Sequence, residues 1–159
     1  ISSAEKRAGE VLPRKGNAKP GLGSILRFGY YYADYLFGQT YIFFKYVLRG
    51  KIVLYDRYYF DFIIDAKRSN ISVSPSLVKK LYTLIYKPKL NFLLWSNAEA
   101  VYARKPEVEV EQISHLNKNY KNLFNDLSKT SNKSVYRVIH NEKIESTLHQ
   151  IMLECRAVA

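Results

Sequence analysis

Two short runs of this chain are almost wholly apolar, IVLY at 52–55 and LNFLLW at 90–95. A strand with one face in water alternates apolar and polar residues, whereas a strand covered on both faces of a parallel sheet is apolar throughout. Both runs therefore predict buried strands of a parallel sheet. Residues 134–139 alternate and predict a further strand.

Helical patterns separate and follow these strands. Ser24, Ser74 and Asn141 are the expected N-terminal caps, Gly50 is the expected stop of the first helix, and Pro106 marks a hinge between two later ones. The expected helices span 24–48, 75–86, 97–105, 107–127 and 141–154. Helices that alternate with strands predict an α/β layer architecture.

Residues 1–23 differ from the rest of the chain. They carry charges, two prolines and four glycines without a hydrophobic period, which predicts a basic loop or linker arm. Its basic side chains either contact phosphate or are solvated. Residues 24–159 have the length of one domain with its own core. Because residue 1 is Ile and the only methionine is Met152, we expect a piece of a longer protein or an unusual start.

The charge of the chain indicates anionic partners. Its 25 Lys and Arg exceed its 14 Asp and Glu, giving a formal net charge of +11. Nucleotides, phosphorylated sugars, nucleic acid and acidic lipid are the classes that such a surface attracts. The single cysteine, Cys155, excludes an internal disulfide and a thiolate metal cluster, and it fits a reducing, cytoplasmic setting. No signal peptide is visible.

The segment 24–48 contains ten aromatic residues. Arg27, Asp34 and Lys45 fall on one side of a helix there. Asp34 and Lys45 interrupt the apolar character of a segment that is short for a bilayer, so we expect no membrane span. The rings are expected in the core or in a subunit contact, and those near Asp34 offer an alternative role as a wall on which a base stacks.

The candidate chemistry lies just past the expected strands. No G-x-x-x-x-G-K-[ST] loop, paired metal-ligating histidines or nucleophile elbow occurs in the 159 residues. What remains is Asp56-Arg57 after the first strand, a group of charged residues beyond it, and Arg104-Lys105 beside the Pro106 hinge. Ligands of open α/β sheets bind at the carboxyl ends of the strands. Phosphoryl transfer requires little from the protein beyond positioning and charge neutralisation, which an aspartate and an arginine can supply. The Asp56-Arg57 pair is equally compatible with a structural ion pair.

The order of these motifs resembles the thymidylate kinase family, in particular the thymidylate kinase-like proteins of bacterial genomes. Leu48-Arg49-Gly50-Lys51 followed by Asp56-Arg57-Tyr58 is the most specific match. Lys87-Pro88-Lys89-Leu90 and the segment 99–105 match the family's second motif strand and its lid. The resemblance covers residues 17–155.

The resemblance implies a three-layer P-loop kinase-like parallel sheet flanked by helices. This chain lacks the segment that would hold the family's first, central strand and its phosphate loop. If the strands at 52–55 and 90–95 kept their family places, a gap of roughly 10 Å would separate them. We therefore expect either a longer protein or direct pairing of these two strands.

The resemblance also assigns roles to residues. Asp56 and Arg57 would lie at the acceptor phosphate and the Mg²⁺ ion, with Asp56 facing the metal. Tyr58 would line the acceptor pocket. Arg104, with Lys105, would approach the phosphates of ATP from a lid at about 103–112. The expected catalytic residues are Asp56, Arg57 and Arg104.

The first helix would supply the rest of the acceptor site. Tyr31 would stack on the acceptor base in place of a phenylalanine, and Asp34 matches an acid of the family's long helix. Tyr35 departs from the family because an arginine for the acceptor phosphate belongs there, and Arg27 or Arg68 would have to compensate. Trp95 and Ser96 likewise replace an acidic-apolar pair.

The expected function is that of a nucleotide kinase which transfers the γ-phosphoryl group of ATP to a nucleoside monophosphate or a related phosphorylated acceptor. The wider superfamily would also allow a nucleoside. The resemblance implies a homodimer formed by helices, here through 24–48. The alternative is a non-catalytic basic binding module for nucleotides or nucleic acid, which would bind in a strongly salt-dependent way.

Overall fold

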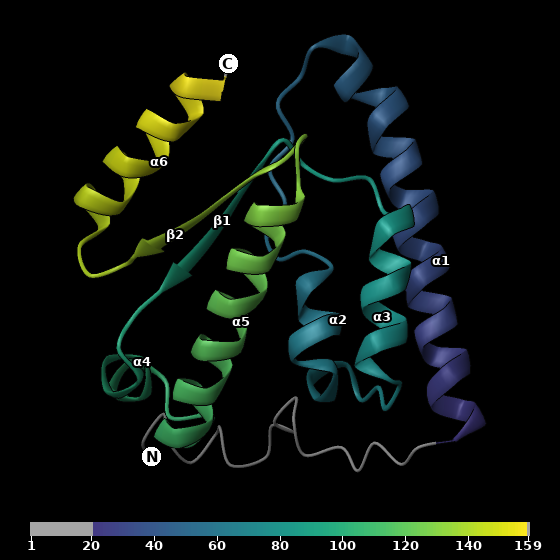
Figure 1. Cartoon of the computed structure of the whole chain (residues 1–159), viewed down its shortest axis with the longest axis horizontal. Helices are drawn as coiled ribbons and strands as arrows, with labels where there is room; N and C mark the ends of the chain where they lie inside the picture. Colours follow the sequence, from purple (N-terminus) through teal and green to yellow (C-terminus); the bar gives the residue numbers. More distant parts are fainter. Residues whose placement is uncertain (1–20, 159) are drawn as a thin grey trace, which may run out of the picture. The chain divides into compact units, whose positions relative to one another are not determined.

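The computed structural model describes residues 21–158, so most of the expected basic arm at 1–23 lies outside the described residues. The chain forms two compact units, one up to Tyr86 and one from Lys87 onward. Figure 1 shows the helices and strands of both units, which are described here one at a time.

The first unit is helical in its described part. Its main element is α1 (Leu22–Lys45), which continues into a 3-10 turn at Val47–Arg49. Two short helices follow, α2 (Phe60–Ile64) and α3 (Pro75–Leu81), with 3-10 turns at Ala66–Ser69 and Tyr82–Leu84. Figure 1 shows α3 alongside α1. The predicted helices at 24–48 and 75–86 are confirmed in these elements.

The two ends of α1 differ from the predicted cap and stop. Gly21 is the N-cap residue in extended conformation, and Ser24 lies inside the helix, where its buried Oγ accepts the backbone N–H of Ser72 at 2.5 Å. The α-helix itself ends at Lys45 with Tyr46 as its C-cap, and the predicted stop at Gly50 ends the 3-10 turn that follows: Gly50 is left-handed at φ 70° and its N–H donates to the carbonyl of Val47. Ser24 was wrong as a cap because its hydroxyl is used in a tertiary contact.

An aromatic core holds the first unit together. Tyr59 is fully buried, stacks on Tyr82 at a ring distance of 5.7 Å and donates its hydroxyl to the carbonyl of Val78 at 3.0 Å. Tyr32 and Tyr35 of α1 meet the same ring edge-on. These rings lie on one side of α1. Its inward positions 28, 32, 35 and 39 have the spacing of one helix face. The expectation that aromatics of this helix form core is confirmed for this face.

The predicted strand at 52–55 is wrong. The segment 51–55 is neither helix nor strand and pairs with no strand among residues 21–158. Ile52 and Leu54 are 91% and 90% exposed, while Val53 and Tyr55 are half-buried. A strand needs a neighbour for its backbone groups, and full burial needs layers on both faces, neither of which a local apolar run supplies. The direct pairing of 52–55 with 90–95 does not occur either.

The second unit is a strand-helix-helix-strand-helix arrangement. It comprises β1 (Leu90–Trp95), α4 (Ala98–Arg104), α5 (Val110–Thr130), β2 (Val135–His140) and α6 (Ile144–Val158). The strands are parallel and in register, from Leu90 opposite Val135 to Trp95 opposite His140. The predicted strands at 90–95 and 134–139 are confirmed, and the helices between and after them begin and end within a few residues of the predicted bounds.

Helices α5 and α6 both contact both strands, and in Figure 1 the strand pair runs between them. Phe124 of α5 meets Tyr136 of β2 edge-on at a ring distance of 5.6 Å, and both are buried together with Ile113, Leu123 and Ile139. The α/β class is thus confirmed as a mostly helical chain with a two-stranded parallel sheet in its described part.

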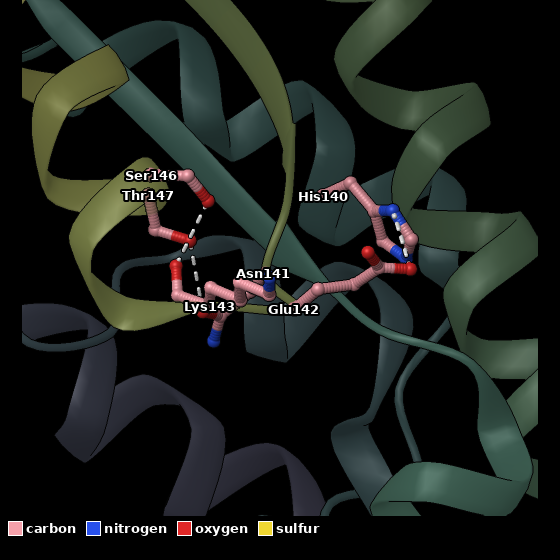
Figure 2. A network of polar contacts seen from close by, with 6 residues as sticks. All are labelled: His140, Asn141, Glu142, Lys143, Ser146 and Thr147. Carbon is pink, nitrogen blue, oxygen red and sulfur yellow. Dashed lines mark hydrogen bonds and ion pairs between the residues drawn. The ribbon is translucent and has the colours of Figure 1, made fainter.

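The start of α6 differs from the prediction. Asn141 lies three residues before the helix, which begins at Ile144. Its backbone N–H donates to the carbonyl of Trp95 at 2.7 Å, and its Oδ1 accepts the hydroxyl of buried Thr147 at 3.1 Å. Figure 2 shows the contact of Asn141 with Thr147, and beside it the carbonyl of Lys143 accepts the hydroxyl of Ser146. Asn141 therefore ties the end of β2 to α6 instead of capping the helix.

Within residues 21–158, no helix combines the length and the apolar character that a bilayer crossing requires.

Candidate functional site

The motif Asp56-Arg57-Tyr58 follows the segment 51–55 and leads into α2. Arg57 has φ 66°, a left-handed conformation that is uncommon outside glycine. Its Nη1 lies 3.2 Å from Oδ2 of Asp61, which stands in the first turn of α2. The Arg57 side chain is still 55% exposed, so its guanidinium remains accessible to an anion.

The two neighbours of Arg57 face different surroundings. Asp56 is exposed at the surface. Tyr58 is buried, and its hydroxyl accepts a hydrogen bond from Nε2 of Gln39 at 2.8 Å and donates to the carbonyl of Tyr86. The motif therefore exposes the side chains of Asp56 and Arg57 next to each other, while the adjacent Tyr58 is buried. The contact of Tyr58 with an acceptor stays a prediction.

Helix α1 brings the predicted acceptor residues next to α2. Tyr31 is 37% exposed and stacks on Phe62 of α2 at a ring distance of 6.1 Å and an angle of 26°. Asp34 is exposed one helical turn later. Arg68 is half-buried in the turn after α2, and its backbone N–H donates to the carbonyl of Asp65. One face of Tyr31 is covered by Phe62, so a planar ligand would stack on its other face.

Tyr35 occupies the position of the family's arginine and supplies no cation. Its ring packs edge-on against Tyr58, Tyr59 and Phe62. Burial, with further contributions from Tyr55 and Asp61, raises the pKa of Tyr35, so the phenol stays neutral. The proposed substitute Arg27 is already engaged, because its Nη1 donates to the backbone carbonyl of Asn70 at 2.8 Å.

The predicted lid residues belong to the second unit. Arg104 is the last residue of α4, is exposed, and donates from Nε to the carbonyl of Ala100 at 3.2 Å. Lys105 follows with its Nζ 2.8 Å from Oε1 of Glu107, and Pro106 stands in the break between α4 and α5. The predicted catalytic residues are thus distributed over two units, Asp56 and Arg57 in the first and Arg104 in the second.

The predicted magnesium site at Asp56 would have few protein ligands among the residues described. No group of three or more His, Cys, Asp or Glu side chains that would hold a metal is found within residues 21–158. Magnesium in phosphoryl-transfer sites is commonly bound by one or two carboxylates, with phosphate oxygens and water as its other ligands. The exposed Asp56 carboxylate suits such a shared site.

A polar cavity in the second unit was not predicted from the sequence. It has a volume of about 410 Å³ at the carboxyl end of β1. Polar residues recur along one face of α5 at helical spacing, and this pattern could have indicated the cavity from the sequence. In the structure this face lines the cavity together with the β1–α4 junction. The lining residues are Trp95, Ser96, Asn97, Ala98, Ser114, Asn117, Lys118, Lys121, Asn122 and Asn125.

Comparison with protein-family models, with curated proteins and with solved structures finds no match for this chain. The assignment to the thymidylate kinase family therefore remains a prediction that rests on the motifs around Asp56 and Arg104.

Proposed function

We propose that the protein is a nucleotide kinase of thymidylate kinase type. It would transfer the γ-phosphoryl group of ATP, with Mg²⁺, to a nucleoside monophosphate. Because no Gly-Lys-Ser/Thr phosphate loop occurs among these 159 residues, the proposal concerns the protein that carries them and requires donor binding by residues other than these.

The observation that carries the proposal is the conformation of Arg57. A non-glycine residue in a sparsely populated backbone region costs on the order of 1–3 kcal/mol, and such residues cluster at functional sites. Here the strained residue is an exposed arginine beside an exposed aspartate, within the motif that resembles the kinases. A purely structural ion pair with Asp61 needs no such strain.

The proposed roles follow from side-chain chemistry. The guanidinium of Arg57 can bind an acceptor phosphate through paired hydrogen bonds. The carboxylate of Asp56 would help hold Mg²⁺, which neutralises charge on the phosphates. Tyr31 would stack on the acceptor base beside Asp34. Arg104 and Lys105 would stabilise the charge that develops on the transferred group.

A three-layer P-loop kinase-like sheet is part of the same proposal. Its support is the unpaired segment 51–55, where two large apolar side chains, Ile52 and Leu54, are almost fully exposed. Inclusion of this segment in a larger parallel sheet would bury both side chains and pair the backbone groups between them.

A homodimer through α1 is proposed with it. An apolar stripe along one face of α1 is exposed, and exposed patches of this kind commonly mark protein contacts. The stripe consists of Leu22, Leu26, Tyr30, Phe37, Tyr41 and Phe44.

The test is an assay of ATP-dependent phosphorylation across a panel of nucleoside monophosphates, with the protein purified from its native source as the reference. Asp56→Asn and Arg57→Gln in the same protein should each lower kcat/KM about a hundredfold or more, the usual effect of removing one charge-stabilising group. Arg49→Gln is the matched control, because Arg49 is an exposed arginine at the end of the 3-10 turn that precedes the segment 51–55. Absence of phosphoryl transfer to every acceptor would reject the kinase proposal.

A second candidate is a basic module that binds nucleotides or nucleic acid without catalysis. The net charge of +11 favours it. For non-specific nucleic-acid binding, the logarithm of the binding constant falls steeply and linearly with the logarithm of the salt concentration. Binding in a shaped pocket is less sensitive to salt. A single-stranded oligonucleotide that binds with a steep salt slope, in a protein without kinase activity, would support this candidate.

A further inference from the structure

The cavity at the carboxyl end of β1 has the position and size of a ligand site. It lies within the second unit, where the β1–α4 junction at Trp95–Ala98 faces α5. Ligands of parallel α/β sheets bind beyond the carboxyl ends of their strands. Small-molecule pockets usually measure about 300–1,000 Å³, and this cavity, at about 410 Å³, falls within that range.

The charges on the cavity wall are of one sign. Lys118 and Lys121 line it, and none of the lining residues carries a carboxylate. No ion pair to either lysine is seen within residues 21–158. Near this end of the sheet, Glu142 is turned to His140, with its Oε1 3.4 Å from Nδ1 of the imidazole (Figure 2). Within the described residues no carboxylate therefore neutralises these two ammonium groups, which leaves both able to bind an anion.

One of these lysines is held in place by an aromatic ring. The Nζ of Lys121 lies 3.0 Å from the ring centroid of Trp95. His140 stacks on the same indole at 4.2 Å and 18°. Since the ammonium and the imidazole cannot occupy one face together, they cover opposite faces of the indole. Trp95 thus positions a cation at the wall of the cavity and is not available to stack on a ligand ring.

The remaining wall supplies neutral hydrogen-bonding groups. Asn117 is fixed, because its Nδ2 donates to the carbonyl of buried Ser96 at 2.9 Å. Other amides and hydroxyls of the wall come from Asn97, Ser114, Asn122 and Asn125. Amide and hydroxyl groups of this kind suit the polar, uncharged part of a ligand, and the lysines suit its anionic part.

We propose that this cavity binds a phosphate-bearing small molecule, with Lys118 and Lys121 on the phosphate and the asparagines on the rest. The site uses none of the residues assigned to phosphoryl transfer, so it stands independently of the proposed kinase activity. A phosphate bound to Lys121 would alter the cation–π contact, so the indole would report occupancy.

The experiment uses Trp95 as the probe, because it is the only tryptophan of the 159 residues. Its fluorescence is followed while the protein is titrated with inorganic pyrophosphate in one series and with AMP in another, at constant ionic strength. Calorimetry repeats each titration, since Lys121→Gln alters the starting fluorescence by itself. The expected result is a saturable change with at least one probe at millimolar concentration or below.

Variants localise the binding. Lys118→Gln and Lys121→Gln should each weaken binding about tenfold, which corresponds to about 1.4 kcal/mol. Lys129→Gln is the matched control, because Lys129 is an exposed lysine in the last turn of the same helix and does not line the cavity. Far-UV circular dichroism checks that each variant keeps its helices.

The outcomes separate the sources of the phosphate. Saturation by AMP alone supports a nucleotide ligand, and saturation by pyrophosphate supports recognition of the phosphate itself. No saturable signal with either probe, or an equal loss in Lys129→Gln, overturns the proposal. Loss of phosphoryl transfer in a protein that still binds AMP here would reject the kinase proposal and leave this site in place.

Discussion

Gln39 joins three parts of the first unit through one buried amide. It is 5% exposed on α1, its Nε2 donates to the Tyr58 hydroxyl at 2.8 Å, and its Oε1 accepts the backbone N–H of Tyr86 at 3.1 Å. Tyr58 in turn donates to the carbonyl of Tyr86. The amide thus connects α1, the Asp-Arg-Tyr motif and the end of the unit in one closed network.

Gln39→Leu removes both hydrogen bonds and keeps a side chain of similar size. An intramolecular hydrogen bond contributes about 0.5–1.5 kcal/mol net, and a buried group left without a partner costs somewhat more. Tyr58 keeps its own bond to the Tyr86 carbonyl, and Tyr86 is exposed, so water can reach part of the network. We therefore expect a loss of about 2 kcal/mol in the free energy of unfolding of this unit.

Urea unfolding followed by far-UV circular dichroism measures the loss. Amide hydrogen exchange at Tyr86 provides a local readout, which should accelerate because its acceptor is gone. Thr40→Val is the control: Thr40 is exposed on the same helix and its hydroxyl donates to the carbonyl of Leu36, so we expect a change below about 0.5 kcal/mol.

A double-mutant cycle with Tyr58→Phe tests the network itself. Because the two side chains share a hydrogen bond, their effects should be non-additive by about 0.5 kcal/mol or more. Equal stabilities of Gln39→Leu and Thr40→Val, or additive effects in the cycle, would refute the reasoning.

Two further predictions concern backbone strain and alkaline pH. Gly50→Ala should destabilise by about 1 kcal/mol, because φ is 70° and no atom lies near the new methyl group, whereas Arg57→Gly at φ 66° should be close to neutral in urea unfolding. Burial raises the pKa of Tyr35 and Tyr59 above the value of about 10 that both have when unfolded. The unfolded chain therefore ionises first, and stability that is complete below about pH 10 falls as the pH rises beyond it. Loss of helix should coincide with the part of the tyrosinate absorbance that appears above about pH 10, when the buried tyrosines ionise. Ionisation of all tyrosines near pH 10 with the helices intact would contradict this.

Local patterns were sufficient where an element carries its own boundaries. The strand at Leu90–Trp95 lies between Pro88 and a polar turn at Ser96-Asn97, and its predicted bounds are confirmed. Helix α1 has a core face at a spacing of three to four residues, begins after Gly21, and is followed by a 3-10 turn that ends at Gly50, so its approximate extent could be predicted. The α/β class follows from the same alternation of periods.

The failures occurred where the outcome depends on distant partners. The run at 52–55 is as apolar as β1, but β1 has β2 beside it and the segment 51–55 has no partner strand within residues 21–158. Ser24 and Asn141 have the side chains of helix caps, and both are used instead by groups far along the chain or across a turn. A hydrogen-bonding side chain takes the partner that folding brings to it, and local sequence does not specify that partner.

The candidate sites divide in the same way. Asp56 and Arg57 were found from sequence because the motif is contiguous and its chemistry is visible in the residue types. The left-handed backbone of Arg57 and the burial of Tyr58 were not, since both depend on contacts with α1 and α2. The cavity of Lys118 and Lys121 became visible only after β1 and α5, some 20 residues apart in sequence, had been packed together. Periodicity records which face of an element is polar, but only tertiary packing decides what that face encloses.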